Sequence, residues 1–543
     1  MKITSRFQTL RVSKTLRVWA VKHHMPTLQR VMRNFYRDSV SLMQFSKGLS
    51  ERPGVQQASA VMATESNLDL LREAGLLEGS VASSPNDLLI VLQGEDAAAL
   101  EQALDEAVAS LTRRPTESGD DGGPRRAPPR SVEMGLGALP GANFVLISTP
   151  GDYAASEALK ALQHGLHVML FSDNVSLDDE IMLKQFARER GLLVMGPDCG
   201  TAIVNGVPLG FANVVRRGNV GVIGASGTGT QQVTCLIDRW GGGVSQALGL
   251  GSHDLHVRIG GLSMLTALDA LAADAATDVI VLISKPPAPE VAARVLDKAA
   301  QIPKPVVVDF LGADPAQVER EGIMAAGTLE EAAAIAVALA QGQPRPPRRT
   351  QLPETHARWA AAARLAPGQR YVRGLFSGGT FCFESLLLLG ETLGGVYSNT
   401  PLKPEYRLAN VWQSQAHTAI DLGDDLFTQG RPHPMIDFRL RNERMIKEAA
   451  DPETAVILLD VVLGYGSNPD PAGELLPAIR QARAVAAEAG RELAFVASVC
   501  GTQSDPQNLA LQEAALRQAG VLLTDSNAQA ARLAAAMAGK ATE

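Results

Sequence analysis

Apolar runs of strand length alternate with amphipathic stretches through most of this chain, which predicts strands followed by helices. The first such series comprises the expected strand 144–148, helix 153–164, strand 167–171, helix 177–190 and strand 192–195. Because the loops between these elements are short, the series predicts right-handed βαβ units and a parallel sheet. The alternation returns twice, with expected strands at 279–284, 305–310, 371–376, 455–461 and 492–498. The sequence therefore predicts an α/β fold with several domains.

This alternation, together with two proline-rich stretches, divides the chain into parts. The expected parts are a basic extension at 1–31, a small ferredoxin-like α/β module at 32–112, a linker at 113–130, a Rossmann-like domain at 131–217, a second α/β domain at 218–341, a linker at 342–368 and a third α/β domain at 369–543. The extension carries no acidic residue, and we expect it to be disordered. It fits either a transit peptide or a stretch upstream of a true start at Met25 or Met32.

Composition excludes several classes of protein. The formal net charge of −8 gives no overall field that would gather nucleic acid or anionic lipid. The four cysteines lie far apart without C-x-x-C spacing, which argues against a zinc site or a disulfide framework and for a reducing cytoplasm. Because the apolar runs are only strand-sized, no membrane span is expected. We expect a cytoplasmic protein without a bound metal.

Two glycine-rich turns at the ends of predicted strands are the strongest functional signal. One reads Gly-Ala-Ser-Gly-Thr-Gly over 224–229, and the other reads Ser-Gly-Gly-Thr over 377–380. A helix follows each turn, so free N–H groups and the positive end of the helix dipole favour an anion. Each turn alone also fits an ordinary capped turn, and neither continues into a Gly-Lys-Ser/Thr phosphate loop. The repetition predicts a bridging phosphate held by Ser226, Gly227, Thr228, Gly378, Gly379 and Thr380.

Charged residues near other strand ends complete the candidate site. Lys285 follows strand 279–284 and can reach the same anion, although a surface lysine fits nearly as well. The loop 421–434 supplies three carboxylates, an arginine and a histidine, which suits a substrate or magnesium but also loop caps and turns. The predicted catalytic residues are Lys285, Arg431 and His433, and the predicted substrate-binding residues are Asp198 and Asp424.

These motifs resemble the succinyl-CoA synthetase superfamily and, within it, the FdrA family. The stretches that carry the resemblance are Phe171-Ser-Asp-Asn-Val, Leu193-Val-Met-Gly-Pro-Asp-Cys-Gly-Thr, Gly221-Val-Ile-Gly-Ala-Ser-Gly-Thr-Gly, Ser284-Lys-Pro-Pro and Gly430-Arg-Pro-His-Pro-Met-Ile-Asp. The resemblance covers about residue 32 to the C-terminus. It implies a CoA-binding-type Rossmann domain at 131–217 and flavodoxin-like synthetase-type domains at 218–341 and 369–543.

In the synthetase, two helix starts face a phosphohistidine, and this chain departs from that pattern. The Gly-His-Ala-Gly loop expected after strand 305–310 is replaced by Leu311-Gly-Ala-Asp-Pro, and the glutamate that orients the family's histidine aligns with Lys285. The glycine-rich CoA loop and the ATP-grasp domain are missing as well. The resemblance therefore implies phosphate or carbamoyl phosphate as a substrate, with CoA not expected.

FdrA-type proteins are implicated in oxamate carbamoyltransferase, which converts oxalurate and phosphate to oxamate and carbamoyl phosphate in allantoin and purine catabolism. The resemblance implies this activity in an oligomer with operon-encoded partner subunits. Two alternatives stay open. One is an NDP-forming acyl-CoA synthetase that works with a separate ATP-grasp subunit, and the other is a non-catalytic subunit that senses a metabolite.

Overall fold

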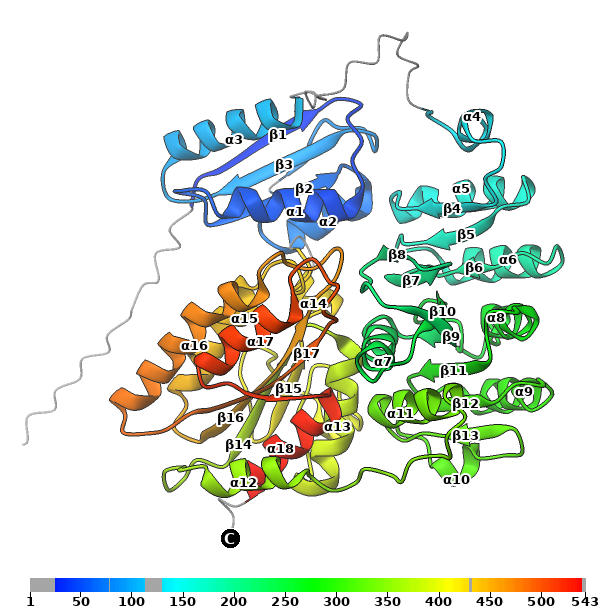
Figure 1. Cartoon of the computed structure of the whole chain (residues 1–543). Coiled ribbons are helices and arrows are strands. Elements are labelled where there is room, and N and C mark those ends of the chain that lie inside the picture. Colours follow the sequence, from blue (N-terminus) through cyan, green and yellow to red (C-terminus); the bar gives the residue numbers. More distant parts are fainter. Residues whose placement is uncertain (1–24, 78, 113–128, 429–431, 540–543) are drawn as a thin grey trace, which may run out of the picture.

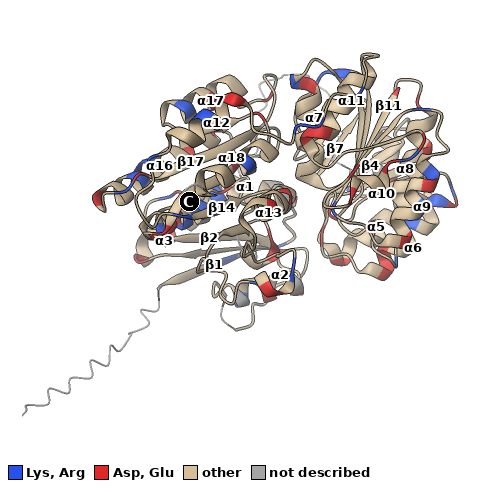
Figure 2. Ribbon diagram, turned by 90° about the horizontal axis from the view of Figure 1, so that it is seen from below, with Lys and Arg blue, Asp and Glu red and all other residues tan. Residues whose placement is uncertain are grey.

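A computed structural model describes residues 25–77, 79–112, 129–428 and 432–539. Within these residues four sheets form, and Figure 1 shows them covered by helices. The α/β fold predicted from the hydrophobic pattern is confirmed. Acidic and basic residues both lie on outer helices such as α6, α9 and α16 (Figure 2). No helix in the described part of the chain is long and apolar enough to cross a membrane.

The N-terminal module is a three-stranded antiparallel sheet with the order β1-β3-β2. Its elements are β1 (Thr27–Met32), α1 (Ser39–Ser50), β2 (Gln57–Met62), α2 (Glu65–Glu73), β3 (Leu88–Gln93) and α3 (Ala97–Thr112). Helices α1 and α3 share one apolar core with the sheet, and α2 contributes to another. The predicted boundary at residue 32 is wrong, because 27–31 already pair with β3. Residues 1–24 of the predicted extension and 113–128 of the first linker lie outside the described residues.

The Rossmann-like domain that follows has a parallel sheet in the order β4-β5-β6. Its elements are α4 (Val132–Ala138), β4 (Phe144–Ile147), α5 (Gly151–Gln163), β5 (His167–Leu170), α6 (Leu177–Arg188) and β6 (Val194–Met195). The predicted end at residue 217 is wrong, because 201–210 form a hairpin that joins the next sheet. Asn205 and Gly206 turn this hairpin with φ of 51° and 81°. Asn-Gly is the preferred pair for such a turn, so the sequence held the signal.

The second α/β domain has a seven-stranded sheet in the order β13-β12-β11-β9-β10-β7-β8. Its elements are β7 (Thr201–Val204), β8 (Val207–Gly210), β9 (Arg217–Ala225), α7 (Gly227–Arg239), β10 (Val244–Gly249), α8 (Leu262–Ala273), β11 (Val279–Ser284), α9 (Pro289–Ala299), β12 (Val306–Phe310), α10 (Pro315–Val318), β13 (Ile323–Ala325) and α11 (Leu329–Ala340). The five strands from β9 to β13 are parallel. Their order is that of a flavodoxin-like sheet.

The third α/β domain repeats this order as β15-β14-β16-β17-β18, with every pair parallel. Its elements are α12 (Glu354–Ala362), β14 (Tyr371–Phe376), α13 (Gly379–Leu393), η1 (Pro404–Tyr406), β15 (Thr418–Asp421), α14 (Asp425–Thr428), α15 (Arg439–Ala450), β16 (Thr454–Val462), α16 (Pro471–Glu488), β17 (Ala494–Cys500), α17 (Leu509–Gln518), β18 (Leu522–Thr524) and α18 (Asn527–Gly539). Helix α12 lies inside the predicted linker 342–368. That interpretation is wrong for α12, because its His356 and Ala360 are buried.

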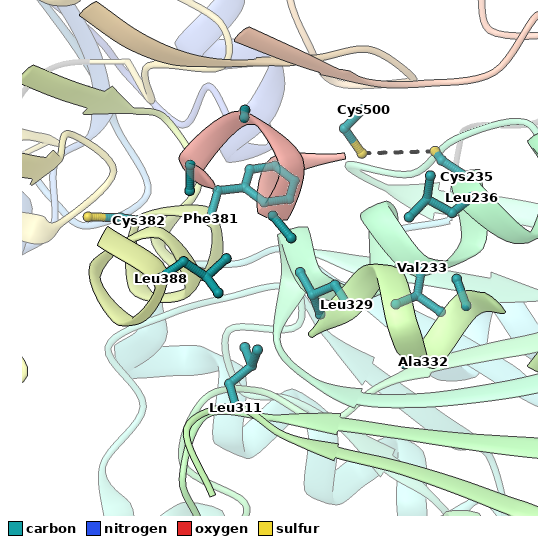
Figure 3. Close-up of a cluster of buried hydrophobic side chains, with 14 of the residues drawn as sticks. Val233, Cys235, Leu236, Leu311, Leu329, Ala332, Phe381, Cys382, Leu388 and Cys500 are labelled. Carbon is teal, nitrogen blue, oxygen red and sulfur yellow. Dashed lines mark hydrogen bonds between the residues drawn. The ribbon is translucent and has the colours of Figure 1, made fainter. Parts of the chain in front are cut away.

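The second and third domains share one apolar core. Buried side chains of α7 and α11 pack with those of α13 and α18 in a single cluster, which includes Leu329 and Phe381 (Figure 3). At one edge of this core, Cys235 of α7 and Cys500 of β17 bring their sulfur atoms to 3.9 Å. Each glycine turn follows the first parallel strand of its sheet, β9 or β14, at the switch point where such sheets bind ligands. The shared core therefore sets the position of one switch point relative to the other.

Candidate functional site

The first glycine turn connects β9 to α7. Ser226 is the N-cap of α7, and its Oγ accepts a hydrogen bond from the N–H of Gly229 (3.1 Å). Within the described residues, the N–H groups of Gly227 and Thr228 have no hydrogen-bond acceptor. They lie at the positive end of the helix dipole, so they are available to an anion.

The second glycine turn connects β14 to α13 and is held by a buried carboxylate. Asp460 of β16 accepts hydrogen bonds from the N–H groups of Ser377 (2.8 Å) and Gly378 (2.8 Å). Arg441 of α15 donates a hydrogen bond to Asp460 Oδ1 (2.9 Å), the oxygen that also accepts from Ser377, and both side chains are buried. The N–H of Gly378 is therefore not free for phosphate, which corrects the predicted role of this residue. The N–H groups of the first residues of α13 remain without an acceptor among the described residues.

The two turns touch each other. Ser226 Oγ and Thr380 Oγ1 share a hydrogen bond of 2.7 Å across the two domains. A Cβ on Gly378 would lie 2.7 Å from Thr228 Cγ2, and one on Gly229 would lie 3.2 Å from Thr380 Cγ2. Glycine is needed at Gly378 because the helix starts approach so closely that no Cβ fits. The two turns therefore meet, and a phosphate held by both would have to lie beside their contact.

Asp421 belongs to this site, although the sequence analysis did not single it out. It ends β15 in register with Phe376 of β14, and a Cβ on Gly379 would lie 2.5 Å from its Oδ2. Its Oδ1 accepts a hydrogen bond from the N–H of Gly423 (3.0 Å). Burial raises the pKa of Asp421 to about 6, against the opposing effect of the Lys285 charge. An aspartate at the carboxyl end of a parallel strand was the signal that could have found it.

Two of the predicted catalytic residues lie in this part of the structure. Lys285 is exposed, and its ammonium lies 5.7 Å from the centroid of the Phe383 ring on α13. His433 is partly buried, and its Nδ1 accepts a hydrogen bond from the N–H of Met435 (3.2 Å). Burial lowers the pKa of His433 to about 4, so its imidazole is neutral at pH 7. The structure therefore offers Lys285 as a cation and His433 as a neutral group.

Asp198 lies beside the first turn. With Ser226 and Gly227 it lines a cavity of about 50 Å³. Its backbone has a positive φ of 57°, and Ser252 Oγ donates to its Oδ2 (3.3 Å). Although Asp198 keeps contact with solvent, the surrounding protein and the Asp173 carboxylate raise its pKa to about 6. The structure thus brings this predicted substrate-binding residue to the start of α7.

The remaining two predicted site residues are Asp424 and Arg431. Asp424 caps the short helix α14, where its Oδ1 accepts a hydrogen bond from the N–H of Leu426 (3.1 Å). This cap is the loop role that the sequence left open, and it occupies one oxygen of Asp424. Arg431 lies outside the described residues.

The start of α5 shows what the Rossmann-like domain can hold. Its N-cap Pro150 makes no side-chain cap, and a Cβ on Gly151 would collide with the backbone oxygens of Asp173 and Asn174. Carbonyl oxygens therefore face this helix start in place of an open glycine turn. Because carbonyl oxygens carry partial negative charge, they would repel a phosphate group placed against this helix start.

Comparison with protein families assigns three parts of the chain. Residues 25–127 match the family model "AllF, heavy metal-associated domain", residues 215–312 match "CoA binding domain" and residues 375–537 match "CoA-ligase". The stretch 25–127 contains neither cysteine nor histidine. In the described residues no group of three His, Cys, Asp or Glu side chains could hold a metal ion. The first match therefore describes the fold of the module, without thiolate or imidazole ligands for a heavy metal.

The chain is also similar to proteins of known sequence or structure. It is 46% identical to the uncharacterized protein YahF of Escherichia coli, over 92% of this chain and 96% of YahF. It is 27% identical to the alpha subunit of the ADP-forming succinate–CoA ligase of Aquifex aeolicus, over 32% of this chain and 57% of that subunit. A dinucleotide-forming acetyl-coenzyme A synthetase from Ca. Korarchaeum cryptofilum matches with a TM-score of 0.31 and 16% identity, over 73% of this chain and 82% of that one. Taken together, the YahF match and the two domain models place this chain in the family of YahF, a family of succinyl-CoA synthetase-like proteins with a CoA-binding and a CoA-ligase domain.

Proposed function

We propose that this chain is the subunit of an enzyme that carries out phosphate and acyl-phosphate chemistry where α7 meets α13. Specifically, we propose that this enzyme is an oxamate carbamoyltransferase, which converts oxalurate and phosphate to oxamate and carbamoyl phosphate. The observation that carries the proposal is the contact between Ser226 and Thr380. It brings two helix starts with free N–H groups to one point near Lys285.

The charges around this point favour a bound phosphate. Each helix start contributes roughly half a positive charge, and Lys285 adds a full one. The carboxylate of Asp460 does not oppose the phosphate fully, because the buried guanidinium of Arg441 balances it. N–H groups aimed at this point would also stabilise the negative charge that develops on an attacked carbonyl oxygen. The same site would thus position the phosphate and lower the barrier for its attack.

The histidines support direct attack by phosphate over a covalent phosphoryl relay. After β12 the chain runs through residues 311–327 without a histidine. His433 uses its Nδ1 to accept a hydrogen bond, and its low pKa keeps it neutral. The family's shuttle residue therefore has no counterpart in this part of the chain, while the helix starts that would face it are retained.

The alternative of an NDP-forming acyl-CoA synthetase is favoured by a different observation. The matches to the CoA-binding and CoA-ligase models cover the same two domains that meet at the glycine turns. In that case a partner subunit would supply the nucleotide site, and the acyl phosphate at the turns would be transferred to CoA.

Reconstitution with the proteins encoded beside its gene tests the proposal. The complex is supplied with oxalurate and phosphate, and carbamoyl phosphate is measured. A parallel assay with carboxylic acids, CoA and ATP measures thioester formation. We expect carbamoyl phosphate to form only when this chain is present. Thioester formation without carbamoyl phosphate would replace the proposal with the ligase. Phosphate binding without either product would make the chain a sensor.

A further inference from the structure

The carboxyl group of Asp421 lies at the start of α13. One oxygen is held by the N–H of Gly423, whereas Oδ2 receives no hydrogen bond from the described residues. Oδ2 lies against Gly379, the first residue of α13, where a Cβ would come within 2.5 Å. The backbone of Asp421 is fixed on both sides by Asn399, which accepts from its N–H (3.0 Å) and donates to its carbonyl oxygen (3.0 Å). The free oxygen is therefore held in a fixed position.

Three charged side chains, Lys285, Asp424 and Asp460, act on the ionisation of Asp421. Lys285 favours its ionised form, whereas Asp424 and Asp460 disfavour it. Cys382 of α13 is fully buried and carries no charge, because burial raises the pKa of its thiol well above the usual value. A phosphate dianion at the neighbouring helix starts would add negative charge close to Asp421. Binding of phosphate would thus favour the protonated carboxyl group, which can donate a proton.

We propose that Asp421 is the proton-transfer group of this site, an inference that rests on the proposed function. Attack of phosphate on a carbamoyl carbon expels an amide nitrogen, which is a poor leaving group unless it is protonated as the bond breaks. Asp421 Oδ2 donates that proton. The site needs such a donor, because His433 is neutral with its Nδ1 engaged and Lys285 is required as a cation.

The step balances in atoms and charge. A phosphate oxygen forms a bond to the carbamoyl carbon, and the bond from that carbon to the amide nitrogen breaks. The electron pair of the broken bond goes to the nitrogen, which takes the proton from Asp421. The carboxylate left behind takes the remaining proton of the monohydrogen phosphate ester, so the carboxyl group is restored for the next turnover.

The test compares two isosteric variants in the reconstituted complex. Asp421→Asn keeps the hydrogen bond to Gly423 but cannot transfer a proton. The control is Asp314→Asn, which keeps a good N-cap for α10. We expect Asp421→Asn to lower kcat about 10²- to 10⁴-fold with little change in the KM for phosphate. A carbamoyl donor with an acidic leaving group, which needs no proton, should recover most of this loss. Equal losses with both donors, or a kcat like that of the control, would overturn the proposal.

A spectroscopic measurement separates failure of this inference from failure of the proposed function. The chain is prepared with ¹³C at the aspartate carboxyl carbons, and the Asp421 signal is assigned as the one that Asp421→Asn removes. We expect its titration midpoint to rise when phosphate is added, even if the complex shows no carbamoyl transfer. An unchanged midpoint would refute a role for Asp421 at the phosphate. A raised midpoint without carbamoyl transfer would refute only the choice of reaction. Asp421→Asn would then be assayed in thioester formation. An unchanged kcat in that assay would refute proton transfer by Asp421.

Discussion

Substitution of Gly378 by alanine tests the contact between the two glycine turns. The backbone of Gly378 has φ of −108° and ψ of 116°, which alanine adopts without strain. The added Cβ would nevertheless lie 2.7 Å from Thr228 Cγ2, 2.9 Å from Thr228 Oγ1 and 2.8 Å from Phe381 Cδ2. Overpacking of this kind costs about 1–3 kcal/mol. We therefore expect Gly378→Ala to lower the free energy of unfolding by that amount.

A double-mutant cycle assigns this loss to the contact between domains. Thr228→Ala removes both Thr228 atoms that the new methyl group would meet. The cost of Gly378→Ala should then fall by about 1 kcal/mol in the Thr228→Ala background, while the clash with Phe381 remains. Unfolding in urea is followed by the fluorescence of Trp240 and Trp359, which pack against the shared core.

The control is Gly390→Ala on the same helix, where a Cβ would meet nothing within 4 Å. This change should leave stability unchanged or raise it by up to about 1 kcal/mol, because alanine is the better helix former. If Gly378→Ala unfolded at the same urea concentration as Gly390→Ala, or showed no coupling to Thr228, the two turns would not be in contact in solution.

Four further predictions concern the same region. Phosphate should raise the Tm in proportion to the logarithm of its concentration above Kd, and Thr228→Glu or Thr380→Glu should abolish this rise through repulsion. Labelled ATP or acyl phosphate should leave no acid-labile, base-stable label on the chain, and a label on His433 would restore the ligase mechanism. Asp460→Asn leaves a buried arginine unpaired and should destabilise the chain by about 3–5 kcal/mol in urea, unlike Asp314→Asn. The pKa of His433 is about 4 in the folded chain and about 6.5 in the unfolded chain, so its contribution to stability should be lost as pH falls from about 6.5 to about 4. His433→Gln should therefore flatten the dependence of Tm on pH over this range.

Much of the fold could be predicted because strand periodicity and βα alternation are local properties of the sequence. The strands β11 and β14 begin and end where the pattern places them. β1 was missed because it follows a basic stretch and carries Arg30 itself, although its Leu28 and Met32 pack into the module. The hairpin of β7 and β8 was missed although its Asn-Gly turn is visible, since the hairpin belongs to a sheet whose first parallel strand comes later in the chain.

The candidate site could be predicted only in part, because its geometry depends on contacts distant in sequence. The two glycine turns predict where two helices start, and the sequence analysis identified both turns. The sequence did not predict that Asp460 accepts a hydrogen bond from the N–H of Gly378, because more than one βα unit separates these two residues. Asp421 was missed for a related reason. Among neighbouring aspartates in one loop, only the pairing of β15 with β14 shows which one reaches the start of α13.

The shared core of the second and third domains also determines how the site responds to dilution. One half of the site comes from α7 and the other from α13, and both helices belong to a single chain connected through residues 341–353. A tether of this kind gives the two halves an effective concentration on the order of millimolar, whatever the concentration of the protein. Assembly of the helix junction is therefore a first-order process, and dilution of the protein should not weaken it.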